Sequence, residues 1–162
     1  FTSDHGYHLG EHTFWQKSNL HEEVLRVPMI ISVPGMKSGR TRSIVELVDL
    51  MPTLAEICDM NVPPTVQGKS LLPVLKDHSV SVKEGALSFH RGGISYRVNG
   101  WSYTRYKGGE EEFYDMKEDP DEFLNLASQD NDKYTSKLKK MRSRFDKRLK
   151  DLGLKIKKQD KN

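Results

Sequence analysis

The first half of the chain contains one long apolar segment. Residues 27–33 form a nearly continuous apolar run that stops at a Pro-Gly pair, residues 34–35. Such a run is typical of a strand buried on both faces of a parallel sheet. We therefore expect a central strand of an α/β domain at residues 27–33.

Helix signals follow this run. Asp49 can cap a helix that has Pro52 in its first turn, where proline's missing N–H is harmless. The Pro-Pro pair at residues 63–64 should end it, so we predict a helix from Asp49 to about Met60. A short helical turn is expected at residues 69–75.

The second half alternates apolar and polar residues with a period of two. Residues 87–89 and 94–98 show this alternation, and Asn-Gly at residues 99–100 is a strong hairpin signal. Residues 101–106, a Gly-Gly turn and residues 112–116 continue the pattern. We predict a small antiparallel sheet.

A helix is predicted after this sheet. Apolar residues recur every three or four positions, which gives an amphipathic helix with one apolar stripe, expected to lie on the sheet: Tyr134, Leu138, Met141, Phe145 and Leu149. The expected organisation is an α/β part at residues 1–80, an α+β subdomain at residues 81–152 and a disordered tail at residues 153–162.

Composition narrows the class of protein. Of the 162 residues 30% are charged, and no apolar run of about 18 residues exists, so we expect no membrane span. The net charge of +3 owes much to lysines in residues 133–161. This basic segment suits nucleic acid or another polyanion, or a solvated helix face; we favour the solvated face and expect no nucleic-acid partner.

The cysteine content says little about function. Cys58 is the only cysteine, which excludes an internal disulfide bond. It follows apolar helix positions, so we expect a buried, inert thiol rather than a nucleophile.

The densest group of chemically active residues lies at the start of the chain. Asp4 and His5 would point to opposite faces of a regular strand, so they can share a target only where the strand ends, and Gly6 supplies a turn there. The ends of strands in α/β enzymes commonly carry metal ligands and contacts to charged substrates.

The order of motifs along the chain resembles the second half of a sulfatase of the alkaline-phosphatase superfamily, and most closely the iduronate-2-sulfatase-like branch. The motifs are Ser-Asp-His-Gly at residues 3–6, Leu-Gly-Glu-His at 9–12, Trp-Gln-Lys at 15–17, the apolar run to Pro-Gly at 27–35, residues 45–54, Gln-Gly-Lys-Ser-Leu-Leu-Pro at 67–73, Glu-Asp-Pro-Asp-Glu at 118–122 and Asn-Leu-Ala at 125–127.

The resemblance implies a fold and site roles. The fold would be the C-terminal portion of an alkaline-phosphatase-like α/β domain, followed by the small α+β subdomain. Asp4 and His5 match ligands of a divalent cation, usually Ca²⁺, and Lys17 matches a lysine that reaches the sulfate. His12 is a candidate catalytic residue that would orient Lys17 or touch the substrate, or only brace the loop. His90 and Arg91 are candidate contacts to an acidic sugar, or face solvent.

The chain departs from the family in one respect. It contains no Cys/Ser-x-Pro/Ala-x-Arg motif, from which sulfatases make their formylglycine nucleophile, and the other acidic metal ligands are absent too. We expect both upstream, in an N-terminal part of the same protein, so the chain alone should be inactive.

The resulting hypothesis is the C-terminal part of a calcium-dependent sulfuric ester hydrolase acting on a sulfated small molecule or polysaccharide. A phosphodiester or phosphonate-monoester hydrolase of the same superfamily, and a non-catalytic binding module, are the alternatives. The family resemblance suggests a periplasmic, secreted or lysosomal enzyme.

Overall fold

The computed structural model describes residues 1–128 and 132–154 of the chain. They form two compact units: Phe1–Asp4 with Val27–Ala86, and His5–Arg26 with the chain from Leu87 onward. Residues 5–26 therefore pack with the second unit, although they precede the predicted boundary in sequence. A domain boundary near residue 80 in the complete protein stays a prediction, and most of the predicted tail lies outside the described residues.

The first unit has little regular structure outside its helices, η2 (Leu47–Asp49), α2 (Leu50–Ile57) and α3 (Leu72–Lys76). Residues 27–33 form no strand. Met29 makes one antiparallel bridge to Thr2, and Ile30 keeps 63% of its surface exposed. The predicted buried strand is wrong for this structure, because burial on both faces needs covering layers that the described residues do not supply.

The helical region of the first unit is organised around Asp49, which is fully buried. Its carboxylate accepts hydrogen bonds from the backbone N–H groups of Glu46 at 2.8 Å and Lys69 at 2.9 Å, and from Lys83 Nζ at 2.6 Å. The predicted helix is confirmed but ends at Ile57. Cys58 follows it and is exposed, so the expectation of a buried thiol is wrong.

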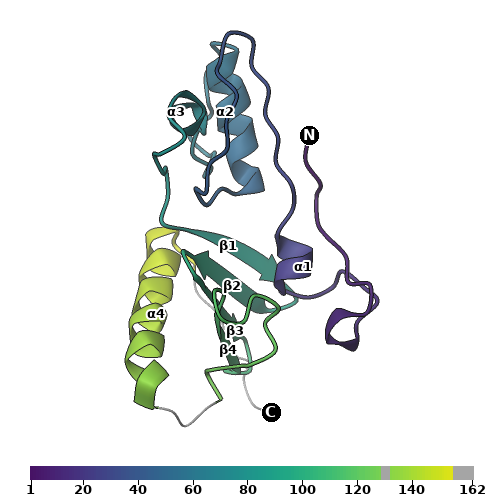
Figure 1. The fold of residues 1–162 in the computed structure, drawn as a ribbon. Helices are drawn as coiled ribbons and strands as arrows, with labels where there is room; N and C mark the ends of the chain where they lie inside the picture. The colour runs from purple at the N-terminus through teal and green to yellow at the C-terminus, as the bar shows by residue number, and fades with distance from the viewer. Residues whose placement is uncertain (129–131, 155–162) are drawn as a thin grey trace. The chain divides into compact units, whose positions relative to one another are not determined.

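A four-stranded sheet forms the centre of the second unit (Figure 1). Its strands lie in chain order, and β2 with β3 and β3 with β4 pair antiparallel: β1 (Gly85–His90), β2 (Gly93–Val98), β3 (Trp101–Tyr106) and β4 (Glu111–Asp115). The helix α4 (Asp132–Asp151) covers one face. The predicted small subdomain of sheet and helix is therefore present.

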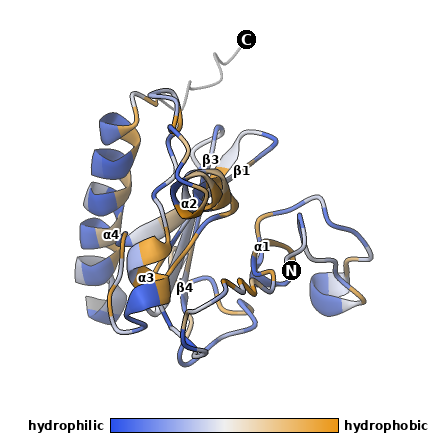
Figure 2. Cartoon of the chain, turned by 90° about the horizontal axis from the view of Figure 1, so that it is seen from above, coloured by the Kyte–Doolittle hydropathy of each residue, from blue (hydrophilic) through white to orange (hydrophobic). Residues whose placement is uncertain are grey.

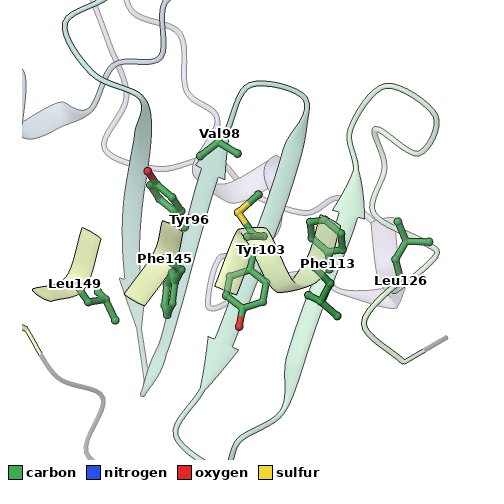
Figure 3. Packing of buried hydrophobic residues seen from close by; sticks show 9 residues of the cluster. Tyr96, Val98, Tyr103, Phe113, Leu126, Phe145 and Leu149 are labelled. Carbon is green, nitrogen blue, oxygen red and sulfur yellow. The ribbon is translucent and has the colours of Figure 1, made fainter. Parts of the chain in front are cut away.

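The core lies between α4 and the sheet. The cross-strand row of Tyr96, Tyr103 and Phe113 presents aromatic rings to Phe145 of α4, and Tyr103 and Phe145 are fully buried (Figure 3). In Figure 2 the outer side of α4 is hydrophilic, whereas its apolar positions face the sheet. The apolar positions of α4, which recur with the helical period of 3.6 residues, thus pack against alternate residues of the strands.

The opposite face of the same strands is polar. Ser95, Thr104 and Glu112 lie in one cross-strand row, and Arg97, Ser102 and Tyr114 in the next. Residues 5–26, with the short helices η1 (Glu11–Thr13) and α1 (Glu22–Leu25), lie on this side, so α1 and α4 are on opposite sides of the sheet (Figures 1 and 2).

Candidate active site

Residues 5–26, which we call the His-rich loop, are anchored to the sheet. Arg97 Nε on β2 donates to Glu22 Oε2 at 3.2 Å, and the two side chains form a partly buried ion pair. Gly93 leaves room for Leu20, since a Cβ at this position would lie 2.8 Å from Leu20 Cδ1. The backbone N–H of Gly6 donates to Val24 O at 2.8 Å and closes the loop.

Lys17 and His5 are in direct contact at this loop. Nδ1 of His5 lies 2.8 Å from the Gly6 carbonyl oxygen, which can only accept, so Nδ1 carries the proton. Nε2 then has a lone pair and accepts a hydrogen bond from Lys17 Nζ at 2.8 Å. The imidazole thus orients an exposed ammonium group.

Two further histidines and two glutamates of the His-rich loop lie close together. His8 is fully buried, and its Nε2 donates to Asn19 Oδ1 at 3.1 Å. Its Nδ1 lies 3.9 Å from Glu23 Oε2 and 4.0 Å from Glu11 Oε2. His12 Nε2 lies 3.8 Å from the other oxygen of Glu23.

Some polar atoms of this cluster lack a hydrogen bond. His8 Nδ1, His12 Nε2 and Glu23 Oε2 are buried and have no hydrogen-bond partner among the described residues. Because an unsatisfied buried polar atom is costly, these three mark a place where a polar group can bind or a proton can be exchanged. No role was predicted for His8 or Glu23 from sequence.

His21 connects the loop to a distant part of the second unit. Its Nδ1 donates to Glu122 Oε2 at 3.0 Å, and its ring stacks on His12 with centroids 4.2 Å apart. Burial lowers the pKa of His21, but the hydrogen bond and charge of Glu122 outweigh it and leave that pKa raised. The carboxylate therefore favours an imidazolium beside His12.

The remaining candidate residues lie elsewhere. His90 ends β1, with its Nε2 buried and lacking a hydrogen-bond partner among the described residues. Arg91 is exposed in the turn to β2, at a φ of +40°. Trp15, from the motif at residues 15–17, is 69% exposed.

The predicted metal ligands, Asp4 and His5, can be judged by their donor atoms. Asp4 is an exposed carboxylate of the first unit, and the tautomer of His5 leaves Nε2 unprotonated, as a ligand requires. Both residue types suit a divalent cation. Across residues 1–128 and 132–154, no three His, Cys, Asp or Glu residues are arranged to hold a metal ion.

Comparison with known proteins identifies the family. The family described as "N-sulphoglucosamine sulphohydrolase, C-terminal" matches residues 10–151. The chain belongs to the sulfatase family. The prediction from its motifs is confirmed at this level.

The curated relatives are all longer proteins. Arylsulfatase K of Xenopus laevis is 32% identical over 90% of this chain and 31% of its own length. N-acetylglucosamine-6-O-sulfatase of Bacteroides thetaiotaomicron is 33% identical over 78% of this chain and 25% of its own length. The chain thus spans roughly a third or less of the relatives that it matches.

Solved structures confirm the alkaline-phosphatase-like α/β fold of sulfatases. A protein in complex with its substrate D-glucosamine-2-N,6-O-disulfate superposes with a TM-score of 0.83 at 29% identity, covering 92% of this chain and 33% of that one. A 2-O GAG sulfatase gives 0.77 at 29% identity over 98% of this chain and 38% of that one. A phosphonate monoester hydrolase from Silicibacter pomeroyi gives 0.78 at 22% identity over 91% and 33%, a likeness of fold alone.

No helix in the described part of the chain has the length and apolarity needed to cross a membrane.

Proposed function

We propose that the complete protein is a sulfuric ester hydrolase that removes sulfate from sulfated sugars, and that it belongs to the iduronate-2-sulfatase-like branch of the family. The observation that carries the proposal is the Lys17–His5 pair, an ammonium group aimed by an imidazole in a chain of the sulfatase family. Relatives and a solved complex with sulfated glucosamine support the sugar class.

In this proposal Lys17 binds the sulfate. Cleaving a sulfate ester requires positive charge on the non-bridging and leaving oxygens, and the Lys17 ammonium group supplies such charge. His12, whose Nε2 faces Glu23, is the candidate to move a proton at the leaving oxygen. His90 and Arg91 are retained as candidate contacts to an acidic sugar.

Asp4 and His5 are the proposed ligands of a divalent cation, Ca²⁺ in most sulfatases. When bound, Ca²⁺ and an upstream formylglycine would supply charge stabilisation and the nucleophile, respectively. One lone pair on His5 Nε2 cannot serve two partners, so a cation and Lys17 would compete for it.

The test compares substrates on the complete protein. An aryl sulfate and a sulfated monosaccharide should be hydrolysed at least about a hundredfold faster than a phosphonate monoester, and Asp4→Ala should abolish most turnover and weaken dependence on Ca²⁺. Preference for the phosphonate would favour the second candidate, which rests on the fold shared with the Silicibacter enzyme.

The 162-residue chain should be inactive alone, since the proposed nucleophile is not in it. Incubation with an aryl sulfate and Ca²⁺ checks this. Turnover that an Asp4→Ala variant loses would refute the assignment of the nucleophile to another part of the protein. Inactivity of the complete protein on every sulfate ester would instead favour a non-catalytic binding module.

A further inference from the structure

The motif Glu-Asp-Pro-Asp-Glu at residues 118–122 has no role in the proposed function, yet its last residue is among the most buried charged groups. Glu122 exposes 3% of its surface and lies at a φ of +55°, which is unfavourable for any residue with a side chain. Such strain is retained where the surrounding contacts hold the residue in place.

Those contacts go to the His-rich loop. Glu122 Oε2 accepts two hydrogen bonds, one from His21 Nδ1 and one from the backbone N–H of Glu22, each at 3.0 Å. One carboxylate oxygen therefore holds a side chain and the first turn of α1, about 100 residues away in sequence.

The neighbouring residue reaches the same place. The ring of Phe123 lies 4.9 Å from the ring of His12, centroid to centroid, at an interplanar angle of 34°. His21 stacks on His12 at 4.2 Å and 13°. Because Phe123 is 70% exposed, burial of its own apolar surface does not account for its position.

His12 needs such support. It adopts a φ of +53° inside η1, and the next residue, Thr13, has a φ of +63°. No side-chain hydrogen bond caps this short helix. Its local backbone is thus unfavourable, and the ring contacts of His21 and Phe123 are available to fix the orientation of the imidazole.

We infer that Glu122 and Phe123 are positioning residues, which hold the His12 imidazole in its working orientation, Glu122 through His21 and Phe123 directly. The role of His12 in turnover rests on the proposed function. The contacts themselves do not, so the orientation of the ring can be tested separately from activity.

The first experiment measures the ring by NMR. In the complete protein, Glu122→Ala and Phe123→Ala should each shift the His12 ring-proton resonances, because the first releases the His21 ring that stacks on His12 and the second removes the neighbouring Phe123 ring. Asp121→Asn and Leu124→Ala, exposed neighbours of the same segment, should leave them unchanged. Glu122→Gln keeps an acceptor oxygen and should restore most of the wild-type shift.

The second experiment measures kinetics with an aryl sulfate. Glu122→Ala and Phe123→Ala should lower kcat by roughly ten- to a hundredfold with KM nearly unchanged, the size expected for a misplaced catalytic group, and Glu122→Gln should recover most of the loss. A merely structural role would reduce the amount of folded enzyme without changing kcat per folded molecule.

The outcomes separate the positioning of the His12 ring from its role in turnover. Unchanged His12 resonances in Phe123→Ala, an exposed substitution expected to fold, overturn the positioning role even if Glu122→Ala fails to fold. Shifted resonances in a protein that hydrolyses no sulfate ester uphold the positioning of the ring and overturn the proposed function. Shifted resonances with unchanged kcat overturn the link to turnover.

Discussion

The two faces of the β2–β4 sheet differ in what the chain uses them for. On one face, Tyr96, Tyr103 and Phe113 pack against α4 in a core with aromatic contacts (Figure 3). On the other face, polar residues such as Thr104 and Glu112 meet a loop crowded with histidine and glutamate. The same strands therefore form the core on one side and carry the proposed active site on the other, because successive residues point to opposite faces.

The largest loss of stability is expected from a substitution on the apolar face. Phe145→Ala should lower the free energy of unfolding by about 3–5 kcal/mol, since the ring is fully buried between Tyr96 and Tyr103 and truncation leaves a cavity. Chemical denaturation, followed by a spectroscopic signal of the second unit, measures this loss of stability. A loss below about 0.5 kcal/mol would mean that α4 does not form the core.

The polar face should make stability depend on pH. The pKa of His21 is raised in the folded state, so its stabilising effect is complete below about pH 6.5 and is lost as pH rises through the folded pKa. The pKa of Glu112, which interacts electrostatically with His21, is also raised, mainly by burial, so protonation of this carboxyl group likewise favours the folded state.

The free energy of unfolding, measured between about pH 5.5 and 8.5, checks the direction of this pH dependence. The free energy of unfolding should decrease across this range in the wild type, and His21→Asn should flatten the decrease. Phe145→Ala, on the other face, should be less stable at every pH and keep the slope. A slope that persists in His21→Asn would assign the pH dependence to another group.

The smallest effect is expected on the solvent side of α4. Lys147 is exposed on the same helix as Phe145, so Lys147→Ala should change the free energy of unfolding by no more than about 0.5 kcal/mol. Chemical denaturation of Lys147→Ala and Phe145→Ala in parallel compares an exposed and a buried residue of the same helix. A larger loss would show that the outer side of α4 is covered.

The apolar face was predictable from sequence because both of its patterns are local. Leu138, Met141 and Phe145 recur at helical spacing, and Asn99 with Gly100 fixes the β2–β3 turn. The strand predicted at residues 27–33 was wrong. An apolar run shows that a strand could be buried, but it does not show whether other elements are present to cover it.

The polar face was predictable only in part. Asp4, His5, His12 and Lys17 were found through family motifs, and the contact between His5 and Lys17 is seen in the structure, although their roles stay predictions. The partnership of His21 with Glu122 was missed because the two lie 101 residues apart, and no local pattern records it.

The most direct test of the account is the rate of sulfate-ester hydrolysis by the complete protein with and without the Lys17 ammonium group. Lys17→Ala should lower the rate by at least about a hundredfold, the usual cost of one lost charge contact in the transition state, with folding unchanged because the side chain is exposed. Lys37→Ala, which removes an exposed lysine of the first unit, should retain the wild-type rate. If Lys17→Ala and Lys37→Ala hydrolyse the ester equally well, the His-rich loop does not bind the sulfate, and the polar face of the sheet does not support the active site.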